Sequence, residues 1–97
     1  MMRVRDHIEQ KIRAALSPSL LIIVDDSHRH QGHAGSHDQG ESHFTVEVVS
    51  AAFENKSRVA RQQLVYGILA EELKTRIHAL SLSTRTPAEE AQREKNV

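Results

Sequence analysis

The chain has 97 residues, which suits one domain, because stable cores belong to units of about 50–200 residues. Thirteen Lys and Arg balance thirteen Asp and Glu, so the chain lacks the strong positive charge of a dedicated nucleic-acid binder. It contains no cysteine, which excludes disulfides, thiolate nucleophiles and metal sites built from its own thiolates. No apolar signal segment or membrane-length apolar run is present, so we expect a cytoplasmic protein, as for a bacterial protein without a signal peptide.

The first half of the chain predicts one helix and two strands. Apolar residues recur at helical spacing over residues 3–16, and Pro18 ends that helix. Residues 20–24 form a short run rich in β-branched side chains, which predicts a strand buried on both faces. Residues 43–50 alternate apolar and polar side chains, which predicts a second strand, antiparallel to the first.

A long polar loop at residues 28–42 separates these two strands. Five of the seven histidines fall between His28 and His43, among Gly, Ser and Asp. Connections longer than about 12–15 residues without structure of their own tend to be functional or disordered. This histidine-rich loop is therefore the first place to expect chemistry.

The second half predicts a long helix and a third strand. Phe53 is expected to fill a gap in the core before a helix over residues 57–74. Within that helix Gly67 costs about 1 kcal/mol relative to Ala, unless close packing requires it. Residues 77–83 then predict a strand reached by a right-handed crossover and parallel to the one before.

A helix-start signature follows, with Thr86 as N-cap and Glu89 completing a capping box. The residues beyond it are mostly polar, so the tail at 90–97 is expected to fray. The pattern as a whole predicts a single α+β domain over residues 1–97, in the order α-β-β-α-β-α. We expect its helices to lie on one face of a three-stranded mixed sheet.

Four segments taken in order resemble the BolA family over nearly the whole chain. The most specific feature is a strand that begins ESHF, followed by an AEEL helix and the tripeptide HAL. The resemblance implies the fold of class II KH domains. The chain departs from the family pattern at Asn55, where a glycine is usual, and at Gln62, where the helix usually has Arg-His. The segments are VDDSHRH (24–30), ESHFTVEVVS (41–50), RQQLVYGILAEEL (61–73) and IHALSLSTRTPAE (77–89).

The resemblance implies an adaptor that binds a monothiol glutaredoxin of the CGFS type, in iron-sulfur cluster trafficking or iron regulation. The two proteins would share a [2Fe-2S] cluster that glutathione also ligates. The implied ligands are His78 and one loop histidine, where the SHRH context favours His30 and the GHAG context favours His33. Two imidazoles can replace two thiolates on one iron, so a chain without Cys is suited to half of such a site. We expect no cluster in the isolated protein, which we expect to be a monomer.

Other interpretations of the same histidines remain open at this point. Spacing alone favours a core or rim histidine at His78, and His43, at the start of a strand, is interpreted as structural. A zinc or copper site in the loop is a weaker alternative, because no HExxH or paired-Cys spacing supports it. A triad drawn from Asp26, Ser27 and His28 would lack fixed geometry, so we expect no enzymatic activity.

The alternative function is that of a DNA-binding transcriptional regulator that uses the KH-like fold. Lys56, Arg58 and Arg61 gather near the start of the long helix and could contact phosphates. The GXXG loop that KH domains place between helices is missing there, since the GXXG at residues 32–35 lies between two strands. A solvated helix face is the simpler interpretation of these three cations.

Overall fold

The computed structural model describes residues 3–26 and 43–95. Its secondary structure confirms an α+β domain with a three-stranded mixed sheet. Over these described ranges, no helix is long and apolar enough to cross a membrane. The elements are α1 (Val4–Leu16), β1 (Leu20–Asp25), β2 (His43–Val49), the 3₁₀ turn η2 (Ala51–Phe53), α2 (Arg58–Ile68), α3 (Ala70–Thr75), β3 (Ala79–Arg85) and α4 (Pro87–Lys95).

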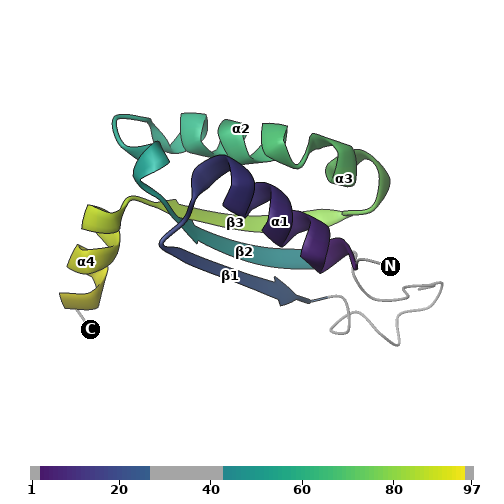
Figure 1. Ribbon diagram of the computed structural model, residues 1–97, viewed down its shortest axis with the longest axis horizontal. Helices are drawn as coiled ribbons and strands as arrows, with labels where there is room; N and C mark the ends of the chain where they lie inside the picture. The colour runs from purple at the N-terminus through teal and green to yellow at the C-terminus, as the bar shows by residue number, and fades with distance from the viewer. Residues whose placement is uncertain (1–2, 27–42, 96–97) are drawn as a thin grey trace.

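The sheet has the order β1-β2-β3, so β2 is the central strand. It pairs antiparallel with β1, with Leu20 opposite Val49, and parallel with β3, with His43 opposite Ala79. Both pairings were predicted. The helices α1, α2 and α3 cover one face of the sheet, and α4 stands apart at its end (Figure 1).

The core lies between β2 and this helical layer. Phe44, Val46 and Val48 alternate toward the helices and are 0–2% exposed, as the period of two predicts. Phe53 is fully buried and completes the core from η2, as expected. The helices contribute the remaining large apolar side chains, among them Ile8, Ile12, Val65 and Leu69.

The prediction that the first strand is buried on both faces is wrong. Ile23 faces the core and is 8% exposed, whereas Ile22 and Val24 are each 39% exposed. The reason is that helices cover only one face of the sheet, so alternate side chains of β1 point away from the helices (Figure 1). A short apolar run does not indicate how many faces of its sheet are covered.

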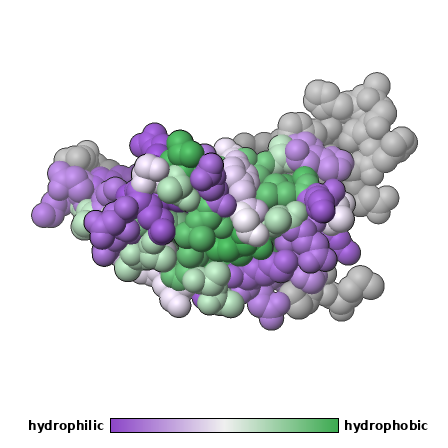
Figure 2. Space-filling view, turned by 90° about the horizontal axis from the view of Figure 1, so that it is seen from above, coloured by the Kyte–Doolittle hydropathy of each residue, from purple (hydrophilic) through white to green (hydrophobic). Residues whose placement is uncertain are grey.

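The single helix predicted over residues 57–74 is interrupted. It ends at Ile68 and restarts at Ala70, because Leu69 adopts φ −100° and ψ 16°, outside the helical region. The outer side of α2 leaves Val59 and Tyr66 exposed. Seen from above, the helical face gathers hydrophobic side chains in its middle, with hydrophilic ones around them (Figure 2).

The third strand begins later than the sequence predicts, and the last helix begins as predicted but extends further. The third strand starts at Ala79 rather than at residue 77, and α4 extends to Lys95. The capping box is confirmed, because the Glu89 N–H donates to Thr86 Oγ1 at 3.1 Å and the Thr86 N–H donates to Glu89 Oε1 at 2.9 Å. No residue of α4 is buried.

The backbone conformation of Asn55 explains why this residue can replace the glycine that the family usually has here. Its φ of 65° lies in the left-handed region, which Gly adopts freely and Asn tolerates better than most residues. The chain therefore keeps the backbone turn that a glycine would make here, with a different side chain.

Candidate functional site

His78 lies immediately before β3, at the end of the sheet. The preceding residue, Ile77, is 4% exposed, and its N–H donates to the Glu72 carbonyl oxygen at 2.8 Å. The following residue, Ala79, is the first that pairs with β2. His78 is thus held on both sides while its own side chain is exposed, which excludes a core histidine.

His43 lies beside it, which the sequence interpretation did not anticipate. The two ring centroids are 6.0 Å apart, and the rings meet edge to face at an interplanar angle of 77°. A signal was present in the sequence. The predicted parallel pairing places the starts of β2 and β3 at the same edge of the sheet, and each start carries a histidine.

The histidine-rich loop begins and ends at this edge. Asp26, the last described residue before it, donates its N–H to the His43 carbonyl oxygen at 2.7 Å, and its carboxylate accepts a hydrogen bond from the Thr45 hydroxyl. The candidate loop ligands His30 and His33 lie outside the described residues, as do His28 and His37. A hollow of about 230 Å³ opens here, lined by Asp26, His43, Phe44, Thr45, Ala79, Leu80 and Ser81.

The two imidazoles at this edge, from His43 and His78, are possible metal ligands. Imidazole nitrogen binds iron, zinc and copper. Within residues 3–26 and 43–95, no three His, Cys, Asp or Glu side chains gather in a way that could hold a metal ion. Further ligands must come from the remaining residues or from another molecule.

The three candidate phosphate-binding cations lie at the other end of the sheet, near the start of α2. Lys56 and Arg58 are exposed. Arg61 is only 12% exposed, because its guanidinium binds both carboxylate oxygens of Glu89 at 2.7 and 3.1 Å. Its Nε also donates to the Lys56 carbonyl oxygen at 3.0 Å. Arg61 therefore ties α2 to α4.

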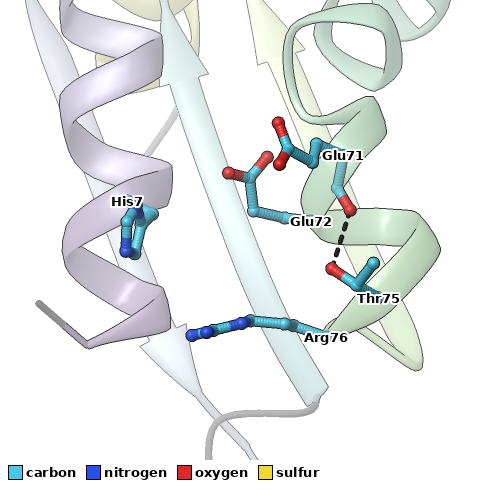
Figure 3. Close-up of a pocket in the computed structure, with 5 residues that line it drawn as sticks. All are labelled: His7, Glu71, Glu72, Thr75 and Arg76. Carbon is cyan, nitrogen blue, oxygen red and sulfur yellow. Dashed lines mark hydrogen bonds between the residues drawn. The ribbon is translucent and has the colours of Figure 1, made fainter.

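A second hollow, of about 120 Å³, lies between α1 and α3 (Figure 3). Glu72 is 7% exposed there and pairs with Lys11 of α1 at 2.9 Å. A hydrogen bond to Glu72 raises the pKa of Lys11, which keeps the lysine charged. We interpret this pair as a link between helices. The hollow is lined by His7, Glu71, Glu72, Thr75 and Arg76.

Comparison with known proteins identifies the family. Residues 12–89 match the family described as BolA-like protein. The chain belongs to the BolA family. The DNA-binding transcriptional regulator BolA of Escherichia coli (strain K12) is 47% identical over 85 residues, which cover 88% of this chain and 77% of that protein. The SufE-like protein 1 of Arabidopsis thaliana is 44% identical over 92 residues, and this BolA-family chain spans only 24% of its length.

Solved BolA structures share the fold. The BolA domain of SufE1 from Arabidopsis thaliana superposes with a TM-score of 0.80 at 40% identity, over 92% of this chain and 98% of that one. The solution structure of BolA1 from Mus musculus gives a TM-score of 0.76 at 38% identity, over 100% of this chain and 74% of that one. The expected BolA-type fold is therefore confirmed.

Proposed function

We propose that this BolA-family protein is an adaptor that binds a monothiol glutaredoxin and ligates a shared [2Fe-2S] cluster, in cluster trafficking or iron regulation. One observation carries the proposal. The exposed side chain of His78 stands at the edge of the sheet where the histidine-rich loop begins and ends, beside His43. The cluster is cargo held between two proteins rather than a resident cofactor.

The chemistry of the donor set supports a shared site. The chain offers imidazoles and no thiolate, since it contains no cysteine. Two imidazoles can take two positions on one iron, and thiolates must fill the positions on the other iron. A glutaredoxin cysteine and glutathione would supply those thiolates. His78 and either His30 or His33 would be the ligands from this chain.

The test is to mix the purified protein with a cluster-loaded monothiol glutaredoxin and to record visible absorption and circular dichroism. We expect the spectrum to change up to a one-to-one ratio with the wild-type protein and not with His78→Ala. His7→Ala is the matched control, because it removes an imidazole from α1. The proposal fails if the wild-type protein leaves the glutaredoxin spectrum unchanged, or if His78→Ala behaves like the wild type.

The same titration distinguishes the two loop candidates. Of His30→Ala and His33→Ala, we expect only one to alter the spectrum of the complex, because one iron takes at most one more imidazole from this chain. If neither variant alters the spectrum while His78→Ala does, neither of these loop residues is the second ligand.

A second candidate function is binding of DNA as a transcriptional regulator. The names of two relatives favour it, since BolA proteins of Escherichia coli (strain K12) and Haemophilus influenzae are described as DNA-binding transcriptional regulators. Lys56 and Arg58 are exposed cations that could contact phosphates. The test is a titration with duplex DNA at two salt concentrations. Affinity that falls with salt, and falls further in Arg58→Ala, would support this function.

A further inference from the structure

Helix α4 is attached to the domain by charged contacts rather than by apolar burial. None of its residues is buried, and it lies at the end of the sheet, away from the other helices (Figure 1). Two glutamates make the closest contacts. Glu89 binds Arg61 at 2.7 Å, and Glu90 binds Arg85 of β3 at 2.7 Å. Both arginines are largely covered, at 12% and 14% exposure. Arg85 is also held by the sheet, through Glu47 of β2 at 2.9 Å and Ser83 Oγ at 2.7 Å.

The pairing of Glu89 has the geometry of anion recognition by arginine. Its two carboxylate oxygens accept from the two terminal nitrogens of one guanidinium, Arg61, at 2.7 and 3.1 Å. Guanidinium binds carboxylate and phosphate through the same planar fork of N–H donors. The hydrogen bonds from Arg61 are the main reason that the pKa of Glu89 falls to about 2. Glu89 therefore occupies a position that a phosphate group could take.

The arginines also line a hollow larger than the carboxylate needs. Its volume is about 460 Å³, and a second hollow of about 240 Å³ shares Arg58, Thr84 and Arg85 with it. Arg58 is exposed, and it forms no ion pair among residues 3–26 and 43–95. The Thr84 hydroxyl oxygen is buried and has no hydrogen-bond partner within the described part of the chain. Among the described residues, Arg58 therefore offers unpaired donors beside the occupied guanidinium groups of Arg61 and Arg85.

We propose that Arg58 and Arg61 form a phosphate-binding site, bordered by Arg85, that α4 covers with the carboxylate of Glu89. A phosphate monoester carries more negative charge than one carboxylate and offers three acceptor oxygens, and a backbone phosphodiester matches the charge of one carboxylate, so either can compete for the same donors. The Glu89 side chain is 48% exposed, and exposed ion pairs are weak and screened by salt, so its pairing with Arg61 is a contact that another anion can replace.

This site is independent of the proposed cluster site. Arg85 ends β3, whereas His78 precedes the start of the same strand. Failure of the glutaredoxin experiment would leave the phosphate site unaffected. If the phosphate belongs to a nucleic acid, the inference rests on the second candidate function and explains why α4 would oppose DNA binding in the resting protein.

The test compares Glu89→Gln with Glu94→Gln in the full chain. Both variants remove one negative charge from an exposed glutamate of α4, but Glu89 binds Arg61, whereas Glu94 pairs with no cation among the described residues. Two probes are used: inorganic phosphate, followed by backbone amide shifts, and a fluorescein-labelled single-stranded oligonucleotide, followed by anisotropy. We expect Glu89→Gln to bind at least one probe more than about threefold tighter than the wild type and Glu94→Gln. Adding Arg58→Ala should remove the gain.

The two probes separate the possible sources of phosphate. Tighter binding of the oligonucleotide, with or without inorganic phosphate, identifies a nucleic-acid backbone as a ligand, and tighter binding of inorganic phosphate alone identifies a small phosphate compound. The proposal is overturned if Glu94→Gln gains as much as Glu89→Gln, because net charge alone would then explain the effect. It is also overturned if neither probe binds Glu89→Gln more tightly. Far-UV circular dichroism checks that each variant is folded. We expect all of them to fold, because no residue of α4 is buried in the core.

Discussion

Replacing Gly67 by Ala should stabilise the protein. Gly67 lies in α2, and a Cβ added to it would meet no atom within 4 Å. Its φ is outside the left-handed region, so an alanine would be unstrained. Alanine is favoured over glycine by about 1 kcal/mol in a helix interior, and by less near a helix end such as this one. We therefore expect the free energy of unfolding to rise by about 0.5–1 kcal/mol. This corresponds to an increase of about 2–8 °C in Tm for a domain of this size.

The assay is thermal and urea unfolding followed by far-UV circular dichroism. Ala14→Gly is the matched control, because Ala14 is exposed in α1 and the reverse change should lower Tm by a similar amount. A lower Tm for Gly67→Ala, with the expected loss in the control, would refute the reasoning. It would mean that the freedom of Gly67 is needed for the interruption at Leu69, two residues on.

Two further predictions concern the contacts that hold the elements together. Ser50 is 1% exposed, and its Oγ donates to the Leu16 carbonyl oxygen at 2.6 Å and accepts from the Ala52 N–H at 3.1 Å. Ser50→Ala should lower the free energy of unfolding in urea by about 1–3 kcal/mol, and a change within error would contradict the role of this bond. The attachment of α4 should also weaken in acid. Because the folded-state pKa of Glu89 is about 2 against an ordinary 4.5, its contribution is complete above about pH 4.5 and is lost as pH falls toward 2. Amide protection factors in α4, which correct for the pH dependence of intrinsic exchange, should fall over that window in the wild type, and an equal fall in Glu89→Gln would contradict the assignment to this carboxylate.

The parts of the fold that follow from local chemistry could be predicted. Side-chain alternation identified β2, because Phe44, Val46 and Val48 must share one face of a strand. The capping signature at Thr86 and Glu89 identified the start of α4, because the reciprocal hydrogen bonds need those residue types at that spacing. The parallel pairing of β2 and β3 followed from the helical crossover between them.

The parts that depend on distant contacts could not be predicted. The exposure of Ile22 and Val24 is set by which face the helices cover, and this is not encoded in residues 20–24 themselves. The interruption at Leu69 has no proline, and Gly67, two residues before it, does not by itself predict a break in the helix. The position of His43 beside His78 could be predicted only by using the pairing of β2 and β3 to place the histidines as well as the core residues. Interpreting His43 from its neighbours in the chain alone missed this.

The two candidate sites sit at opposite ends of one strand, and this separation makes each testable alone. The seven residues of β3, Ala79–Arg85, rise about 3.3 Å each, so the site at His78 lies roughly 20 Å from the arginines around Arg85. Charges that far apart at the surface are largely screened, because the Debye length is about 8 Å at physiological salt. A variant of Glu89 should therefore leave cluster binding unchanged, and a variant of His78 should leave phosphate binding unchanged. Coupling between the two would require movement of the sheet or of the helices packed on it, since direct electrostatics cannot supply it.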